Sequence, residues 1–127
     1  MSLSDSKLKE KADVAMTSLL HEKGYISAVE VLLKLSYLSK EDYENWRQGR
    51  IDYLERVCKL NLSKLSTLNH EIRSFAVKHD LKTSIYDYKR EGHQLRFSKS
   101  GDYKIEKYYA SHYYSKQSNA RDGKEDE

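Results

Sequence analysis

A chain of 127 residues, 38% hydrophobic and 34% charged, is long enough for one small hydrophobic core but short for two. Its 23 lysines and arginines against 20 acids leave a net charge of +3, which excludes a histone-like polycation and an acidic solvating protein. No apolar run is long enough to span a membrane, and the N-terminus has no apolar signal core. The single cysteine, Cys58, cannot form an internal disulfide, so we expect a cytoplasmic protein.

The first 30 residues carry the signals of two helices. Apolar residues recur at helical spacing from Leu8 to Leu20, and Gly24 follows as a left-handed C-terminal cap. Ser27 and Glu30 have the spacing of a capping box, in which the serine hydroxyl accepts from the N3 amide and the glutamate carboxylate reaches back to the cap. The sequence therefore predicts that one helix ends at Gly24 and that another begins at Ser27.

Three further helix starts follow, each with a polar side chain that can accept from the first turn. They lie at Ser39 with Asp42, at Asp52 with Glu55, and at Asn61. The last of these helices is expected over residues 62–79, with one apolar face made of Leu62, Leu65, Leu68, Ile72, Phe75 and Ala76. We expect this stripe and Trp46 to belong to one helical core.

The composition changes near residue 82. Between residues 82 and 116 there are eight basic and four acidic residues, and seven of the 11 tyrosines lie in the same stretch. Two β-prone runs, residues 84–90 and 94–98, flank Glu91-Gly92-His93 and predict a short hairpin or loop. Asp102 is expected to cap a last helix that continues through His112.

These observations predict a mainly α fold: a small multi-helix domain with a short C-terminal hairpin or loop and a last helix. Residues 1–116 form a single domain in this interpretation, and residues 82–116 are its basic, tyrosine-rich part. Residues 117–127 have no apolar anchor and are expected to be a flexible tail.

The basic, tyrosine-rich segment is the strongest candidate for binding, and it favours a non-enzymatic nucleic-acid-binding protein. Cations neutralise phosphates, and interleaved tyrosines offer flat faces to unpaired bases of DNA or RNA. The candidate phosphate contacts are Lys89, Arg90, Arg96, Lys99, Ser100, Lys104 and Lys107. The candidate stacking or interface residues are Tyr86, Tyr88, Tyr108 and Tyr109.

Residues 96–101, Arg-Phe-Ser-Lys-Ser-Gly, are the sharpest local feature of that segment. Small hydroxyls, a glycine and two cations precede an expected helix start, where free amides favour an anion. The spacing is not that of a Walker P-loop, so nucleotide hydrolysis is not implied. A solvated turn that leads into a helix would have the same composition.

Other interpretations stay open at this stage. Tyrosine and arginine also suit a protein-interaction or self-assembly module, such as a homodimer. Two helices over residues 27–37 and 39–48 have helix-turn-helix proportions, but acids at the start of the second disfavour contact with DNA. His93, His112 and Lys99 could form an acid–base group, although no catalytic motif supports it. We expect no metal and no cofactor, because the five histidines lack paired ligand spacing.

Three stretches resemble a group of small bacterial proteins of unknown function. The first is Trp46-Arg47-x-Gly49-Arg50-x-x-Tyr53-Leu54-Glu55, and the second is Leu95-Arg96-Phe97-Ser98-Lys99-Ser100-Gly101-Asp102. The third is Ile105-Glu106-x-x-Tyr109. The resemblance covers roughly residues 20–115; it implies a bacterial, cytosolic protein and assigns no activity and no site residue.

Overall fold

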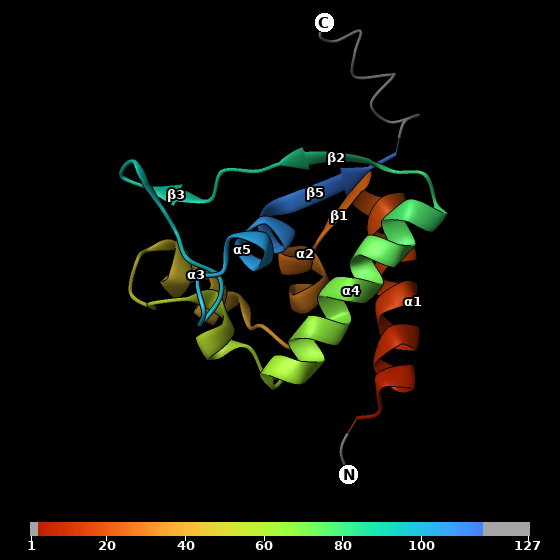
Figure 1. Ribbon diagram of the computed structural model, residues 1–127, viewed down its shortest axis with the longest axis horizontal. Helices are drawn as coiled ribbons and strands as arrows, with labels where there is room; N and C mark the ends of the chain where they lie inside the picture. Colours follow the sequence, from red (N-terminus) through yellow and green to blue (C-terminus); the bar gives the residue numbers. More distant parts are fainter. Residues whose placement is uncertain (1–2, 116–127) are drawn as a thin grey trace, which may run out of the picture.

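The computed structural model describes residues 3–115, in which helices precede most of the strands (Figure 1). The helices are α1 (Asp5–Lys23), α2 (Ala28–Lys34), α3 (Lys40–Arg47), the 3-10 helix η1 (Leu54–Val57), α4 (Leu62–Lys78) and α5 (Tyr103–Ala110). The strands are β1 (Tyr25–Ser27), β2 (Lys82–Ile85), β3 (Lys89–Arg90), β4 (His93–Gln94) and β5 (Ser111–Tyr114). The predicted mainly α fold with a short C-terminal hairpin and a last helix is confirmed. No helix within residues 3–115 is long and apolar enough to cross a membrane.

Most of the predicted helix ends are present. The side chains of Ser39, Asn61 and Asp102 accept backbone N–H groups of the first turn at 3.0, 2.8 and 2.9 Å. Gly24 ends α1 with φ of 82°, a conformation that glycine adopts without steric cost. These ends were predictable because each depends on residues only two to four positions apart.

The capping box at Ser27 is only half formed. The Ser27 hydroxyl accepts from the Glu30 amide at 3.2 Å, as predicted. The Glu30 carboxylate does not return to the cap but accepts from the Tyr25 hydroxyl at 3.0 Å. The residues before the cap form β1, so Tyr25 brings a donor from the sheet to this carboxylate.

The predicted start at Asp52 and Glu55 is wrong. A 3-10 helix begins after Tyr53, with no side-chain cap, and Asp52 instead binds Arg56 at 2.8 Å. Glu55 turns toward the C-terminal third of the chain, where long-range partners take both of its oxygens.

The three-stranded sheet was not predicted. Its order is β1-β5-β2, with β5 antiparallel to both neighbours, and Tyr113 lies opposite Ile26 on one side and Thr83 on the other. The predicted last helix therefore stops at Ala110 instead of continuing through His112. Residues 111–114 alternate between buried and half-buried, which suits a strand paired on both edges.

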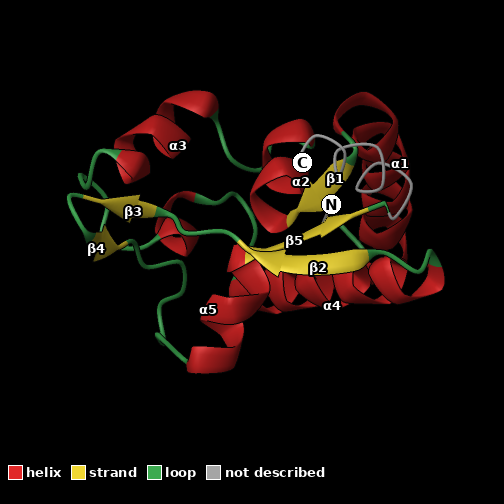
Figure 2. Ribbon diagram, turned by 90° about the horizontal axis from the view of Figure 1, so that it is seen from above, coloured by secondary structure: helices red, strands yellow, loops and turns green. Residues whose placement is uncertain are grey.

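The predicted hairpin is shorter than expected. The two β-prone runs pair through β3 and β4, with Lys89 opposite Gln94 and Arg90 opposite His93, and the Leu95 amide also donates to the Tyr88 carbonyl at 2.8 Å. Residues 84 and 85 of the first run belong instead to β2, which pairs with β5. The hairpin thus forms a separate two-stranded ribbon beyond the sheet (Figure 2).

One hydrophobic core joins the helices to the C-terminal third. The three strands of the sheet lie on one side of the helices, over α2, α4 and α5 (Figures 1 and 2). Trp46 is fully buried as predicted, and its indole N–H donates to the Arg96 carbonyl at 2.8 Å. The stripe of α4 is buried except for Leu62, which is 53% exposed. Phe97 and Tyr109 add their rings to the same core.

His112, on the central strand, is enclosed by tyrosine rings. Its imidazole stacks on Tyr25 and on Tyr86, with ring centroids 4.9 Å apart in both pairs. Its Nε2 lies 2.8 Å from the Tyr88 hydroxyl. Burial raises the pKa of Tyr88, so the phenol stays protonated and donates to the neutral imidazole. Burial lowers the pKa of His112, while the charge of Glu30 opposes this shift more weakly.

Acidification is therefore expected to destabilise the fold through His112. The unfolded chain binds a proton at this group near pH 6.5, whereas the folded protein binds it only at lower pH. The stabilisation present above about pH 6.5 should be lost as the pH falls through the lowered pKa. Chemical denaturation between pH 7.5 and about 5 should show this loss, and His112→Phe should reduce it. The exposed His93 provides the control: His93→Asn should leave the slope as in the wild type, and an equal slope in His112→Phe would contradict the assignment.

Candidate functional site

The candidate phosphate contacts lie on three neighbouring pieces of the surface. Lys89 and Arg90 lie on the β3–β4 hairpin, Arg96, Lys99 and Ser100 on the connection to α5, and Lys104 and Lys107 on α5. All seven side chains belong to exposed residues. The hairpin cations each have an acid nearby, since Lys89 lies 3.9 Å from Asp87 and Arg90 lies 3.5 Å from Glu91.

Carboxylates of the protein itself occupy the amides of the 96–101 loop. Glu106 accepts from the Phe97 amide at 3.0 Å, from the Ser98 amide at 2.7 Å and from the Ser98 hydroxyl at 2.6 Å. Glu55 accepts from the Lys99 amide at 2.9 Å. Within the described chain, the anions that these amides bind are therefore Glu55 and Glu106.

Arg96 also stabilises this loop. Its guanidinium donates to the carbonyls of Ser98, at 2.8 Å, and Lys99, and it lies over the Tyr53 ring at 5.6 Å. The Ser100 hydroxyl accepts from the Asp102 amide at 3.1 Å, just before α5 begins. Among residues 96–110, Arg96 is therefore the cation whose side chain binds the loop backbone, and the side chains of Lys99, Lys104 and Lys107 do not.

The four candidate tyrosines divide into two groups. Tyr88 and Tyr109 are buried, at 4% and 1% exposure, and both rings contact Phe97. Tyr86 is 48% exposed and stacks on His112, and Tyr108 is half-buried beneath the guanidinium of Arg73 at 3.7 Å. Only Tyr86 and Tyr108 of the four can therefore offer part of a ring to a partner without repacking the core.

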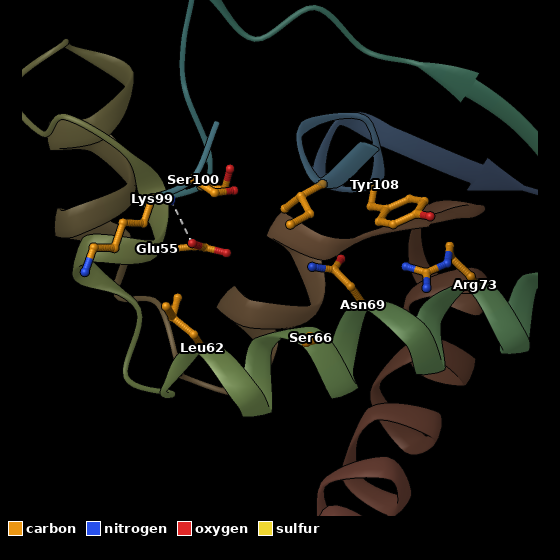
Figure 3. A pocket seen from close by; sticks show the side chains of 10 residues that line it. Glu55, Leu62, Ser66, Asn69, Arg73, Lys99, Ser100 and Tyr108 are labelled. Atoms are coloured by element: carbon orange, nitrogen blue, oxygen red, sulfur yellow. Dashed lines mark hydrogen bonds between the residues drawn. The ribbon is translucent and has the colours of Figure 1, made fainter. Parts of the chain in front are cut away.

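A pocket of about 510 Å³ lies between α4, α5 and the 98–100 connection (Figure 3). Its apolar wall consists of Leu62, Ile105 and Tyr108. Its polar lining comes from Glu55, the 98–100 connection, and one face of α4 with Ser66, Asn69 and Arg73. In Figure 3 the Glu55 carboxylate points into the pocket, Arg73 and Tyr108 lie together at its other end, and Lys99 points away.

Sequence reasoning assigned no role in a site to Glu55, Asn69, Arg73 or Glu106. Asn69 carries one signal that could have identified it, since a polar residue interrupts the apolar face of α4 between Leu65 and Ile72. Its burial, at 7% exposure, shows that the interruption faces inward. Glu55 and Glu106 gave no such signal, because their partners lie on other elements of the fold.

The structure gives no support for an acid–base group that includes His93 and His112. His112 is enclosed by three tyrosines, and the exposed His93 lies on the hairpin opposite Arg90. Comparison with protein-family models, curated proteins and solved structures finds no match, so the site rests on its own geometry.

Loss of the Glu106 carboxylate should destabilise the protein. Glu106→Ala leaves the amides of Phe97 and Ser98, both in buried residues, without their acceptor, at a cost of about 1–3 kcal/mol for each orphaned donor. Chemical denaturation should show a loss of at least about 2 kcal/mol. Glu91→Ala is the matched control, because that exposed acid should change stability by no more than about 0.5 kcal/mol. Equal losses in the two variants would exclude this role for Glu106.

Proposed function

We propose that this protein binds nucleic acid without catalysis, through the exposed cations of its C-terminal third. The observation that supports the proposal is the exposure and charge environment of Lys99, Lys104 and Lys107. All three are exposed, and none forms an ion pair with an acidic side chain of residues 3–115. Such cations can neutralise phosphates and release the counterions condensed on a nucleic acid, which favours binding to a polyanion.

Single strands are the proposed substrate class, either DNA or RNA. The loop amides already bind Glu55 and Glu106, so phosphates would meet lysine side chains. Tyr108 and the 77% exposed Tyr103 provide aromatic surface on α5, the helix that carries Lys104 and Lys107, and Tyr86 is a further exposed tyrosine directly after β2. Aromatic surface next to cations favours unpaired bases, which can stack, over a duplex whose bases are already stacked.

We also propose the reducing cytoplasm of a bacterium as the setting. The resemblance carried by residues 46–55, 95–102 and 105–109 supports a bacterial source. The only cysteine, Cys58, is half-buried, and burial raises its pKa to about 12, so its thiol stays protonated. A protonated thiol is a weak nucleophile and suits a structural residue better than a redox residue.

Removing two lysines of α5 should weaken binding and its dependence on salt. Lys104→Ala with Lys107→Ala should lower affinity for every sequence and flatten the salt slope by about 1.4 units on single strands. Fluorescence anisotropy with labelled DNA and RNA at several salt concentrations measures both quantities.

The matched control is Lys9→Ala with Lys11→Ala, two exposed lysines of α1 that lie outside the basic segment. This variant should bind with nearly wild-type affinity. If the wild-type protein shows no salt-dependent binding to any strand, or if both double variants lose affinity equally, the proposal is wrong.

Self-assembly is the second candidate function, and the β2 edge favours it. β2 is exposed along its whole length and pairs with β5 on one side only. The Tyr86 amide donates inward to the Ala110 carbonyl at 2.9 Å, so alternation directs the Thr83 and Ile85 amides outward. An open edge of this kind is a template for another strand.

Sedimentation equilibrium tests self-assembly through this edge. Ile85→Pro removes an outward amide that the isolated chain does not use in its ladder, so it should shift a dimer to monomer. Lys82→Ala changes an exposed side chain of β2 and keeps every amide, so it should leave the dimer intact. A monomeric wild-type protein would exclude this second candidate.

A further inference from the structure

The pocket beside α4 is negatively charged at one end and positively charged at the other. The Glu55 carboxylate faces it from η1, and the Arg73 guanidinium lies with Tyr108 at its other end (Figure 3). A ligand that carries only negative charge would be repelled by Glu55, and a ligand that carries only positive charge would be repelled by Arg73. The pocket therefore suits a ligand with hydrogen-bond donors at one end and a negative charge at the other.

At the acidic end, protein donors fix Glu55 without using all of its acceptor capacity. The Lys99 amide donates to Oε1 at 2.9 Å, and the Tyr109 hydroxyl donates to Oε2 at 2.7 Å. A carboxylate accepts about four hydrogen bonds, so each oxygen has capacity for one more. The two existing bonds hold the group in one orientation, which makes it a preorganised acceptor.

At the basic end, Arg73 has donors available. Its guanidinium stacks on Tyr108, and no acidic side chain of the described chain forms an ion pair with it. Asn69 interacts with the Tyr109 hydroxyl that binds Glu55, and Arg73 lies four residues later, about 6 Å further along α4. More than one turn of helix thus separates Asn69 from Arg73, and Figure 3 shows Asn69 between Glu55 and Arg73.

The space between the two ends is lined by Leu62, Ile105 and the Tyr108 ring. Its volume of about 510 Å³ lies in the range of small-molecule pockets. Apolar walls with a few polar groups at the ends suit a flat heteroaromatic ring, because the faces of such a ring are apolar and its edge carries donors.

We infer that this pocket is a subsite for one unpaired nucleotide, whose base donates to Glu55 and whose phosphate binds Arg73. The choice of ligand rests on the proposed nucleic-acid binding. The geometry selects among bases: guanine presents two adjacent donors, N1–H and the 2-amino group, to a carboxylate. Uracil presents a single N–H between two carbonyl oxygens, which the carboxylate repels. Guanine is therefore the preferred base and uracil the poorest.

Calorimetric titration with GMP and UMP tests the subsite directly. The wild-type protein should bind GMP more tightly than UMP. Ser66→Phe adds a ring from an exposed position that lines the pocket and should weaken GMP binding by about tenfold or more. Ser74→Phe places the same ring at an exposed position of α4 that does not line this pocket, and it should bind GMP as the wild type does.

Glu55→Gln tests the selectivity. The amide still accepts from one of the two protein donors, but its NH₂ group can donate to a uracil carbonyl, so the preference for GMP over UMP should shrink. If this variant does not fold, the effect of Ser66→Phe on GMP binding still tests the inference. Absent mononucleotide binding, equal binding of GMP and UMP by the wild type, or GMP binding that Ser66→Phe leaves unchanged would each overturn the inference.

Strand binding measured in parallel separates this inference from the proposed function. If mononucleotides fail to bind while strands bind with the salt dependence assigned to Lys104 and Lys107, the subsite is wrong and the nucleic-acid proposal stands. If GMP binds selectively while no strand binds, the pocket is a mononucleotide site and the strand-binding proposal is wrong. If neither binds, both fail.

Discussion

The fold depends on how the backbone of residues 96–99 is held. The Arg96 carbonyl accepts from the Trp46 indole at 2.8 Å and from the Leu54 amide at 3.2 Å, and the Phe97 carbonyl accepts from the Glu55 amide at 2.9 Å. On its donor side, the same segment binds the carboxylates of Glu55 and Glu106. A short stretch without regular secondary structure thus connects α3, η1 and α5, and the ring of Phe97 is buried as a result. Because these bonds join positions about 10 to 50 residues apart, the helical and the basic parts of the chain stabilise each other.

The sequence allowed prediction of features whose causes are local. The caps at Ser39, Asn61 and Asp102 each need a hydroxyl, amide or carboxylate two or three residues before a free amide. The apolar stripe of α4 needs only helical periodicity. The sheet could not be predicted in this way, because β1 and β5 pair residues more than 80 positions apart and each strand is only three or four residues long. A short strand has too few residues for its alternation to compete with a helical interpretation, so the last helix was predicted to continue through His112, which lies in β5.

In the candidate site, too, features with local causes were predictable and features with long-range causes were not. The basic character of residues 82–116 was visible in composition, and the lysines of this segment that the structure describes are exposed: Lys82, Lys89, Lys99, Lys104 and Lys107. Two of the four selected tyrosines, Tyr88 and Tyr109, are instead core residues; a buried tyrosine needs a partner for its hydroxyl, and both hydroxyls have one. The partners are His112 and Glu55, and neither could be paired with its tyrosine before the fold was known. The pocket was hidden for the same reason, since its walls come from η1, α4, α5 and the connection before α5.

Tyr109 links the stability of the fold to the chemistry of the pocket. Burial, and then the charge of Glu55, raise the pKa of its hydroxyl far above the ordinary range, so the phenol remains a donor at any physiological pH. A permanent donor on Oε2, together with the Lys99 amide on Oε1, keeps the Glu55 carboxylate in one orientation. The Lys99 amide belongs to the segment that Glu106 also holds, so loosening that segment would also loosen the acceptor of the pocket. The residues that close the core are therefore the residues that would aim Glu55 at a ligand.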